Sequence, residues 1–335
     1  MNIHEKYVKR CIELAKNGLG NTYPNPLVGS VIVYKDRIIG EGWHQKSGEA
    51  HAEVQAVNSV KDKSLLSKST IYVSLEPCSH FGKTPPCCDL IIKYEIPNIV
   101  IGTIDPFAKV AGNGIEKLLV AKRNVIVGIL AIECEELNKR FFTFHQKKRP
   151  YIILKWAESA DGFIAPLLKE KQEPVWITNT YSRQLVHKWR SEEHAILVGT
   201  QTVIDDNPTL TVRDWTGNNP IRIVIDKNNR ISKESHIFDN QAKTIVVSEN
   251  TIDFTKNVAA QIADYLFESE IQSVIIEGGT QTLQTFIDAG IWDEARIFKG
   301  LILFHKGTNA PVLKSKSYEK SMLIDDELLI CKNHD

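Results

Sequence analysis

The strongest constraint on the fold of this chain is a set of metal-binding residue types spread over one strand and two helices. His51 stands two residues before Glu53, and a Pro-Cys pair ending at Cys78 is followed, after eight intervening residues, by Cys87. Residues 70–75 alternate and are β-rich, so they predict a strand that ends just before Cys78. His51 and Cys87 each begin a stretch with helical apolar spacing. The fold must therefore bring a strand end and two helix N-termini together, as at the carboxyl edge of an α/β sheet.

The residue types at these positions suit a catalytic zinc ion. An imidazole from His51 and thiolates from Cys78 and Cys87 supply three ligands, and the fourth position stays open for water, whose pKa zinc lowers to about 7. Glu53 can accept a proton from that water and return it to a ring nitrogen and to leaving ammonia. A His-x-Glu followed by Pro-Cys and a further Cys is the signature of zinc deaminases, so we expect hydrolytic deamination of a nitrogen-bearing ring.

Other interpretations of the same residues stay open at this point. Free cysteines are usually buried apolar residues, so the pattern is also compatible with a structural zinc site or with no metal. The order of five matching residues along strand, turn and helix favours the catalytic site. The long spacing departs from the usual Pro-Cys-x-x-Cys, and Cys88 competes with Cys87 as the last ligand. We favour Cys87 because it directly follows two prolines.

Length and charge limit the architecture and the partners of the chain. With 335 residues it is long enough for two domains, each with its own core. Its 41 Lys and Arg residues balance 41 Asp and Glu residues, and zero net charge argues against broad binding to nucleic acid. The N-terminus has no apolar signal core and no apolar run is long enough to span a bilayer, so we expect no membrane association. Six cysteines without a disulfide framework indicate a cytoplasmic protein.

Strand and helix patterns alternate along the chain, which predicts an α/β fold with two domains. A basic run before Pro150 is typical of a helix end and a linker, so we place the first domain at 1–147 and the second at 150–335. In the first domain we expect helices at 3–19, 51–60, 87–95, 114–122 and 132–145, and strands at 28–34, 38–43, 70–75, 98–102 and 125–127. In the second we expect strands at 151–157, 195–198, 221–225, 244–247, 274–276, 293–298, 301–304 and 328–331, with helices at 179–190, 256–268 and 280–289.

The second half carries only weak local motifs. Glu277 precedes two glycines that follow a strand and open a helix, where a backbone can approach a pyrophosphate, although such glycines more often serve the turn alone. Residues 198–208 place hydroxyls, carboxylates and an Asn-Pro turn directly after a buried strand, and a capped helix is the simpler explanation. Arg190 and Arg213 could bind a phosphate bidentately, although lone arginines are more often solvated.

Over nearly its whole length the sequence resembles the bacterial bifunctional deaminase-reductase family of riboflavin biosynthesis. The residues between Cys78 and Cys87 end in Gly-Lys-Thr-Pro-Pro, a loop that is highly specific for this family among zinc deaminases. The resemblance explains the long spacing and selects Cys87 over Cys88. The matching segments are 24–29, 51–53, 76–87, 155–162, 176–178, 199–213 and 277–279.

The resemblance implies a fold and a reaction for each domain. The first domain resembles the cytidine-deaminase fold, a three-layer α/β sandwich, and would use one Zn²⁺ to remove an amino group from a diaminopyrimidinone ribosyl phosphate. The second domain resembles the dihydrofolate-reductase fold, another α/β fold, and would use NADPH to reduce the ribosyl group to a ribityl chain. The preference for NADPH over NADH rests on the resemblance alone.

The resemblance also assigns site residues in the deaminase domain. It retains the three zinc ligands and the general acid/base Glu53. Four further residues match positions that hold the pyrimidine: Asn25, His44, His80 and Lys83. An ammonium from Lys83 that faces a ring carbonyl would stabilise the charge that develops during attack.

In the reductase domain, Lys155 and Asp206 match polar residues at the ribose end, where a Lys–Asp pair could manage the proton that accompanies reduction. Further substrate contacts match Arg190, Leu210, Arg213 and Glu277. The matching cofactor contacts are Ala157, Trp176, Thr202, Asp206, Gly279, Thr280, Gln281, Thr282, Leu283, Gln284 and Thr285.

The sequence departs from the family pattern after the first strand of the reductase domain. Residues 165–174 form a longer segment than the usual Gly-Ser-type loop, and Pro174 stands where a serine contact is expected. Phe163 replaces the usual basic residue. Neither change removes a residue that we expect to be catalytic.

Three rival hypotheses share some of these features. A nucleic-acid or nucleoside deaminase with a non-catalytic C-terminal module is disfavoured by the zero net charge and the long loop. A C-terminal half that only binds substrate or dimerises has no need of Lys155, Asp206 and Glu277. A non-enzymatic zinc scaffold would tolerate Glu53→Gln. We therefore expect an enzyme that acts on small molecules and assembles as a homodimer or higher homo-oligomer.

Overall fold

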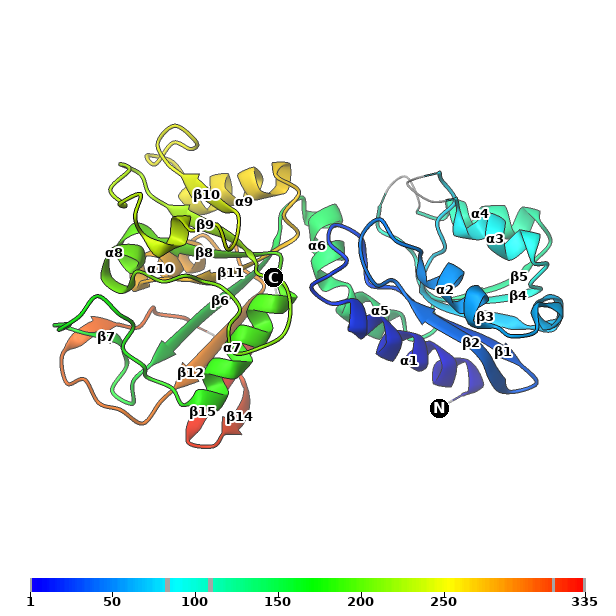
Figure 1. The fold of residues 1–335 in the computed structure, drawn as a ribbon, viewed down its shortest axis with the longest axis horizontal. Helices are drawn as coiled ribbons and strands as arrows, with labels where there is room; N and C mark the ends of the chain where they lie inside the picture. The colour runs from blue at the N-terminus through cyan, green and yellow to red at the C-terminus, as the bar shows by residue number, and fades with distance from the viewer. Residues whose placement is uncertain (1, 82–84, 108–110, 315–316, 334–335) are drawn as a thin grey trace. The chain divides into compact units, whose positions relative to one another are not determined.

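The computed structural model describes residues 2–81, 85–107, 111–314 and 317–333 of this chain. The chain divides into two compact units, Met1–Lys147 and Lys148–Asp335, and each unit has its own sheet and its own hydrophobic core (Figure 1). The predicted α/β fold class is confirmed, because both units combine a sheet with covering helices.

The sheet of the first unit has five strands in the order β2-β1-β3-β4-β5. Its strands are β1 (Gly29–Tyr34), β2 (Arg37–Trp43), β3 (Thr70–Leu75), β4 (Asn98–Thr103) and β5 (Asn124–Val127). β1 is antiparallel to β2 and β3, whereas β3, β4 and β5 are parallel. The segments that follow β3 and β4 therefore start side by side at the carboxyl edge of the sheet.

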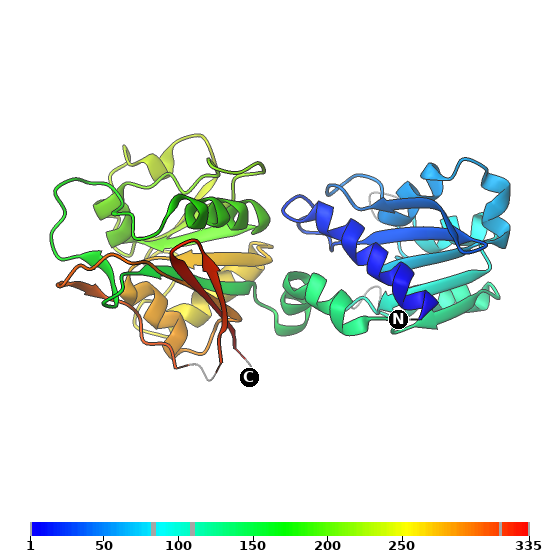
Figure 2. The same ribbon diagram turned by 90° about the horizontal axis from the view of Figure 1, so that it is seen from below.

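Helices cover both faces of this sheet and give the unit three layers. They are α1 (Ile3–Ala15), α2 (Ala52–Ser59), α3 (Cys87–Lys93), α4 (Asn113–Val120), α5 (Ala131–Leu137) and α6 (Lys139–Lys147), with 3-10 helices at Lys16–Gly18 and Lys63–Lys68. Side chains alternate along a strand, so Ile71 and Val73 pack with α2, α3 and α4. Tyr72 packs on the opposite face with α1 and α5. Figure 2 shows α1, in dark blue, lying across the strands of this sheet.

One predicted helix, at 132–145, is two helices in the structure. α5 ends at Leu137 and α6 begins at Lys139. Asn138 between them is buried, and its amide accepts a hydrogen bond from the N–H of Leu27 (2.8 Å) and donates one to the Leu27 carbonyl (2.9 Å). The helix is interrupted here because a buried amide must find hydrogen-bond partners, and these partners lie on a distant segment.

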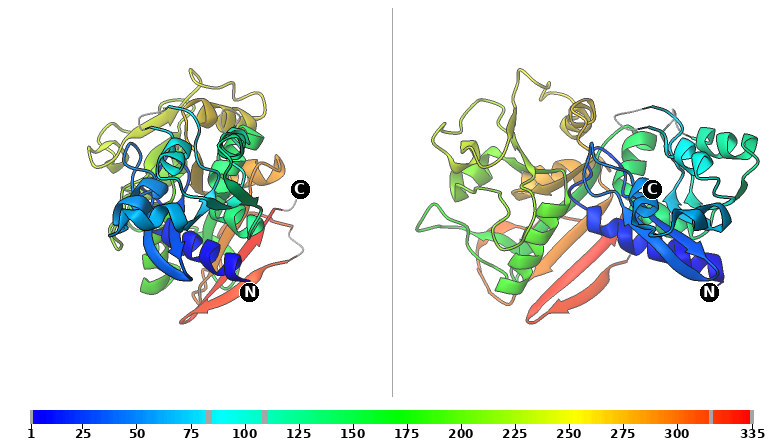
Figure 3. Two further views of the ribbon diagram at one scale, coloured as in Figure 1. Left: turned by 90° about the vertical axis from the view of Figure 1, so that its right-hand side faces the viewer. Right: turned by 45° about the vertical axis from the view of Figure 1, so that its right-hand side comes forward.

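The sheet of the second unit has eight strands in the order β10-β9-β8-β11-β6-β12-β15-β14. Its strands are β6 (Tyr151–Glu158), β8 (Ala195–Gly199), β9 (Ile221–Ile225), β10 (Thr244–Val247), β11 (Ser273–Glu277), β12 (Glu294–Lys299), β14 (Glu319–Leu323) and β15 (Asp326–Lys332). The strands from β10 to β12 in this order are parallel. The antiparallel hairpin of β14 and β15 extends the sheet beyond β12 (Figure 3).

The prediction of a strand at 301–304 was wrong. This segment is irregular, and Leu301 and Leu303 are exposed, so their alternation marks no buried strand face. Two short strands that were not predicted, β7 (Phe163–Pro166) and β13 (Gly307–Asn309), pair with each other in a separate sheet.

Helices cover both faces of the second sheet as well. They are α7 (Thr180–Glu192), α8 (Thr200–Asp206), α9 (Val258–Glu268) and α10 (Thr280–Asp288), with a 3-10 helix at His236–Phe238. α7 and α8 pack against Ile153 and Ile196, whereas α9 and α10 pack against Ile152 and Leu197 on the other face. Among the helices of the described residues, none combines the length and the apolar character needed to cross a membrane.

Arg222 on β9 is a fully buried cation that ties together several segments beside the sheet. Its side chain is 0% exposed and forms an ion pair with Asp239 (2.8 Å). Its guanidinium also donates to the Thr244 hydroxyl and to the backbone carbonyls of Thr209, His236, Asp239 and Ala242. These bonds satisfy a charge that would otherwise be costly to bury.

Candidate functional site

The three predicted zinc ligands converge at the carboxyl end of the first sheet. His51 directly precedes α2, Cys78 follows β3, and Cys87 is the first residue of α3. His51 Nδ1 lies 3.6 Å from Cys78 Sγ and 3.3 Å from Cys87 Sγ, and the three ligand atoms all lie within 4.8 Å of one another. Tetrahedral zinc with ordinary bond lengths separates a histidine nitrogen from a cysteine sulfur by about 3.6 Å, so these donors fit the metal.

Electrostatics at this centre suit proton transfer beside a thiolate ligand. Glu53 is 3% exposed, burial raises its pKa, and the neighbouring Cys78 adds to the rise. A hydrogen bond from Cys87, together with His51, lowers the pKa of Cys78 to about 4 despite its burial. These shifts favour the thiolate form of Cys78, which zinc binds, and the raised pKa of Glu53 suits a carboxyl that takes and returns a proton.

Cys88 points away from the three ligands. Its Sγ contacts the carbonyl oxygens of Pro77 (3.3 Å) and Gly114 (3.5 Å). Cys87 Sγ, in contrast, lies 3.3 Å from His51 Nδ1 and belongs to the group of three ligand atoms. The geometry therefore favours Cys87 over Cys88 as the third ligand.

His44 and Asn25, two of the residues expected to hold the pyrimidine, lie beside the metal centre. The ring centroids of His44 and His51 are 5.4 Å apart, and His44 is 2% exposed. The Asn25 amide donates to His44 Nε2 (3.0 Å), and His44 Nδ1 donates to the Ala50 carbonyl (3.3 Å). Burial lowers the pKa of His44, in agreement with this neutral ring.

The other two expected pyrimidine contacts follow Cys78 in the long loop. His80 is exposed, and its ring centroid lies 6.5 Å from that of Phe107. Lys83 lies outside the described residues, so its predicted role stays a prediction.

Two buried carboxylates beside this site were not singled out from the sequence. Glu76 is 4% exposed and accepts hydrogen bonds from the backbone N–H groups of Asp105, Gly112, Gly114 and Ile115. Asp105 is 7% exposed; burial raises its pKa to about 7, and the charges of Glu76 and Cys78 contribute to the rise. Partners that are backbone groups leave no pattern of residue types in the sequence, which is why these carboxylates were missed.

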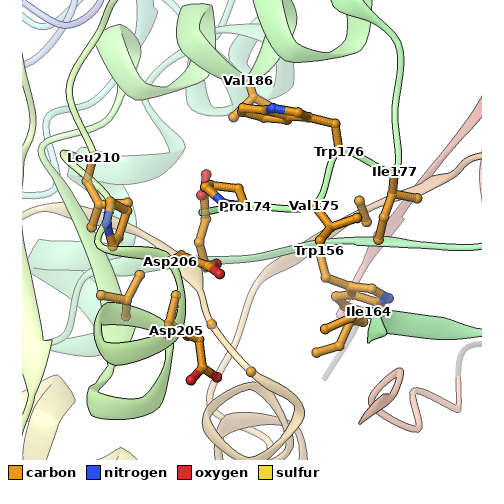
Figure 4. A pocket seen from close by; sticks show the side chains of 18 of the residues that line it. Trp156, Ile164, Pro174, Val175, Trp176, Ile177, Val186, Asp205, Asp206 and Leu210 are labelled. Atoms are coloured by element: carbon orange, nitrogen blue, oxygen red, sulfur yellow. The ribbon is translucent and has the colours of Figure 1, made fainter. Parts of the chain in front are cut away.

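The second unit contains a cavity of about 610 Å³ at the carboxyl ends of β6, β8 and β11. Figure 4 shows Pro174, Trp176 and Asp206 around this space, with Trp156 and Leu210 also in its wall. Ten of the expected substrate and cofactor residues line it: Lys155, Ala157, Trp176, Arg190, Thr202, Asp206, Leu210, Arg213, Glu277 and Gly279. A cavity of this size with mixed apolar and charged walls is suited to small-molecule ligands.

A buried cluster of two cations and one carboxylate forms part of this wall. Glu277 Oε2 accepts a hydrogen bond from Arg190 Nη2 (2.8 Å), and Glu277 Oε1 lies 3.8 Å from Lys155 Nζ. Burial raises the pKa of Glu277, but the charges of Arg190 and Lys155 outweigh it and hold the pKa at about 2. Burial, assisted by Arg190, lowers the pKa of Lys155 even though Glu277 opposes this shift.

Two polar atoms of the same cluster make no hydrogen bond within the described residues. Within the part of the chain that the structure describes, Arg190 Nε and Glu277 Oε1 are buried and have no hydrogen-bond partner. With one carboxylate between two cations, the cluster carries a net positive charge when Lys155 is protonated. This net positive charge favours an anionic ligand in the cavity that the cluster lines.

Lys155 and Asp206 do not pair with each other. Lys155 is paired with Glu277, whereas Asp206 forms an ion pair with Lys169. Lys169 lies on the strap (residues 167–174), the part of the 165–174 segment that follows β7. The amide of Gln172 on the strap donates to the Ile204 carbonyl on α8 (2.6 Å), so the strap is fastened beside the cavity at two points.

Neighbouring side chains fix two further cavity residues. Trp176 is half-exposed and stacks with Arg183, whose guanidinium carbon lies 4.4 Å from the ring centroid. The backbone N–H of Arg213 donates to His187 Nδ1 (3.1 Å). Burial, followed by the charge of Arg190, lowers the pKa of His187 to about 4, so its ring is neutral and accepts this bond.

The remaining expected cofactor residues follow Gly279 on α10 and are not among the described residues that line the cavity: Thr280, Gln281, Thr282, Leu283, Gln284 and Thr285. Leu283 is fully buried in the core. Thr282 packs against the ends of two parallel strands, since a Cβ added to Gly199 or Gly278 would lie 2.6 Å and 3.2 Å, respectively, from its side chain. Glycine at these two strand ends keeps the start of α10 close to the cavity, where a helix N-terminus favours a phosphate group.

Both units match families of known proteins. Residues 1–103 match the family model of the cytidine and deoxycytidylate deaminase zinc-binding region, and residues 150–308 match that of the RibD C-terminal domain. The riboflavin biosynthesis protein RibD of Aquifex aeolicus is 37% identical over 96% of this chain and 94% of its own length. RibD of Escherichia coli is 36% identical over 88% of this chain and 86% of its own.

Solved structures agree with these matches. The diaminohydroxyphosphoribosylaminopyrimidine deaminase/5-amino-6-(5-phosphoribosylamino)uracil reductase of Thermotoga maritima is 36% identical, covers 99% of both chains and superposes with a TM-score of 0.88. RibD of Acinetobacter baumannii is 29% identical over 99% of both chains, with a TM-score of 0.87.

These matches confirm the expected family and fold class, and they disfavour a nucleic-acid deaminase with a non-catalytic module. The donor set of the first unit fits zinc, and the second unit carries the reductase-type domain with its cavity. The chain therefore belongs to the RibD family, the bifunctional enzymes of riboflavin biosynthesis that join a zinc-dependent deaminase to an NADPH-dependent reductase.

Proposed function

We propose that the first unit deaminates 2,5-diamino-6-(5-phosphoribosylamino)pyrimidin-4(3H)-one and that the second reduces the ribosyl group of the product, 5-amino-6-(5-phosphoribosylamino)uracil. The observation that carries this proposal is the pairing of two complete sites on one chain. One is the ligand triad with buried Glu53 beside it; the other is the cavity with the Lys155, Arg190 and Glu277 cluster. The printed name of the Thermotoga maritima relative, which includes both reactions, supports the choice of substrates.

In the deaminase site, His51, Cys78 and Cys87 would hold zinc, which would supply Lewis-acid activation of a water molecule. Glu53 takes a proton from that water and passes it to the ring nitrogen and then to the departing ammonia. Water and the ring amine are thereby converted into a ring carbonyl and ammonia. Asn25 and His44 form one wall of the pyrimidine site, since their mutual hydrogen bond fixes both side chains beside the metal centre.

His80 and Lys83 complete the proposed pyrimidine contacts. The loop that carries them follows Cys78 directly, so it starts at the metal centre. A cation from Lys83 near a ring carbonyl would stabilise negative charge during attack.

In the reductase site, bound NADPH would supply the hydride that the anomeric carbon of the ribosyl group gains. Lys155 gives a proton to the ribose ring oxygen as the carbon–oxygen bond opens, because burial and Arg190 lower its pKa and make the ammonium a stronger acid than an exposed lysine. Glu277 keeps Lys155 and Arg190 in place, and Arg190 and Arg213 bind the substrate phosphate. Leu210 packs against the substrate from the opposite wall.

The proposed cofactor site runs from β6 to α10 along the same cavity. Ala157, Trp176, Thr202 and Asp206 line the cavity, and Gly279 opens α10 where a pyrophosphate can approach the helix N-terminus. The rest of the proposed contact segment follows on α10: Thr280, Gln281, Thr282, Leu283, Gln284 and Thr285. For Leu283 the contact can involve only its backbone, because its side chain is in the core.

Mass spectrometry of the diaminopyrimidinone ribosyl phosphate incubated with the purified chain tests both reactions. Without NADPH we expect loss of one amino group as ammonia and accumulation of the ribosyl product. With NADPH we expect the ribityl product and an equal amount of NADP⁺. Unchanged starting material in the presence of zinc would contradict the first assignment, and accumulation of the ribosyl product despite NADPH would contradict the second.

The homodimer or higher homo-oligomer and the cytoplasmic location stay predictions within this proposal. The substrates are small molecules, and zero net charge supports the expectation of no nucleic-acid partner. Mass photometry of the purified chain and fractionation of cells that produce it test the two predictions.

A further inference from the structure

Glu76 is a buried carboxylate placed between a sheet strand and a metal ligand. The chain leaves β3 at Leu75 and passes through Glu76 and Pro77 to Cys78. The backbone N–H of Glu76 donates to the carbonyl of Thr103, the last residue of β4 (3.0 Å). The backbone at Glu76 is thus attached to the neighbouring strand just before the chain reaches the ligand.

Both carboxylate oxygens of Glu76 bind the segment that follows β4. Oε2 accepts from the backbone N–H groups of Asp105 (3.3 Å) and Gly112 (2.9 Å), and Oε1 accepts from those of Gly114 (2.9 Å) and Ile115 (3.3 Å). The last two belong to the first turn of α4, whose N–H groups have no acceptor within the helix. A single carboxylate therefore joins the end of β3 to the turn before α4 and to the start of that helix.

The two segments joined by Glu76 are also packed without spare room. A Cβ added to Gly114 would lie 2.1 Å from the Pro77 carbonyl oxygen and 3.3 Å from Cys88 Sγ. On the other side, the backbone N–H of Cys88 donates to the Cys78 carbonyl (3.2 Å). The backbone on either side of the ligand is therefore held, by α4 through Glu76 and by α3 through Cys88.

We propose that Glu76 is a positioning residue of the deaminase, which holds Cys78 Sγ at the distance from His51 and Cys87 that the metal requires. Metal–ligand distances tolerate only about 0.2 Å of variation, so a ligand on a loop needs such an attachment. Loss of the carboxylate bonds releases the first turn of α4 and, with it, the carbonyl of Pro77, against which Gly114 packs. The inference rests on the proposed zinc-dependent deamination and extends it to a residue that is not itself a ligand.

Glu76→Gln tests the inference in the full-length, zinc-loaded protein. The amide has the size of the carboxylate, but its nitrogen cannot accept, so two of the four N–H groups lose their acceptor. We expect zinc transfer to a chromogenic chelator to become about 10- to 100-fold faster and ammonia release to slow. Reduction of supplied deaminated substrate should be unchanged, which shows that the reductase unit is folded. Glu116→Gln, the same change at an exposed position of α4, should leave every measurement at the wild-type value.

Cobalt in place of zinc separates positioning from a loss of folding. The thiolate-to-cobalt absorption band depends on ligand geometry, so we expect Glu76→Gln to shift it and Glu116→Gln to leave it unchanged. Glu76→Asp keeps both oxygens on a shorter side chain and should give intermediate zinc transfer, which keeps the test valid if the Gln variant does not fold.

Wild-type zinc transfer and a wild-type cobalt band in folded Glu76→Gln would overturn the inference. The proposed reaction has a separate point of failure. If the wild-type chain released no ammonia while Glu76→Gln still lost metal faster, the deamination would be wrong and the positioning role would stand.

Discussion

Replacing Glu277 with Gln should destabilise the reductase unit by about 3 kcal/mol at neutral pH. The cations around Glu277 lower its pKa from the ordinary 4.5 to about 2, and at 1.36 kcal/mol per pKa unit this lowering corresponds to about 3 kcal/mol of stabilisation by the ionised form. The side chains of Lys155 and Arg190 are only 15% and 11% exposed, so solvent screens little of this interaction. The variant leaves both buried cations without their carboxylate, which is known to be costly.

The pH dependence of this loss follows from the direction of the shift. Because the folded-state pKa is lowered, the stabilisation is fully present above pH 4.5 and declines as the pH falls toward 2. The difference between wild type and Glu277→Gln should therefore shrink by about 2 kcal/mol between pH 7 and pH 3.

Urea unfolding followed by tryptophan fluorescence measures this difference, because five of the six tryptophans lie in the second unit. For a domain of this size, about 3 kcal/mol also lowers Tm by about 6–12 °C. Glu268→Gln, an exposed change on α9, is the matched control and should alter neither quantity. Equal stability of wild type and Glu277→Gln at pH 7, or a difference that stays constant down to pH 3, would refute the charge-cluster reasoning.

Three further predictions test the two sites separately. Glu53→Ala should abolish ammonia release, by more than about 100-fold, yet leave reduction of supplied deaminated substrate intact; loss of both activities in a folded variant would contradict separate sites. Cys87→Ser should lose zinc on dialysis, as measured by metal analysis, whereas Cys88→Ser should retain it; the opposite result would exchange the two residues as ligands. Lys169→Met should raise the KM for NADPH about 5-fold, the equivalent of about 1 kcal/mol, because Asp206 loses its partner on the strap. Lys171→Met, at an exposed position, is the control; an equal rise in KM there would assign the effect to surface charge instead.

The metal centre was predictable because the residue types of its ligands are typical of zinc sites. His51, Cys78 and Cys87 are chemically unusual residues, and the predicted strand and helices around them place their side chains at one sheet edge. Most strands of the two sheets were predictable for a related reason, since long apolar runs such as that of β6 have few alternatives to burial.

The partners of the reductase residues could not be predicted from the sequence. Lys155, Arg190 and Glu277 come from β6, α7 and β11, and only the folded sheet brings them together. Lys155 was expected to pair with Asp206, but Asp206 forms its ion pair with Lys169. No periodic pattern in the strap indicates which of its residues contacts α8. The helix break at Asn138 was also not predictable, because its hydrogen-bond partner, Leu27, is more than a hundred residues away in the sequence.

Two parts of the reductase cavity wall differ in how firmly the surrounding structure holds them: the segments bonded to the buried guanidinium of Arg222, and the strap. Arg222 does not line the cavity itself, but it donates hydrogen bonds to Thr209 and His236, which do. Substitution of Arg222 on β9 should therefore change ligand affinity. The strap has only two side-chain attachments to α8 and carries exposed leucines. Laboratory evolution toward a different cofactor or substrate should therefore accumulate its adaptive substitutions in residues 167–174 and leave the Arg222 side of the cavity unchanged.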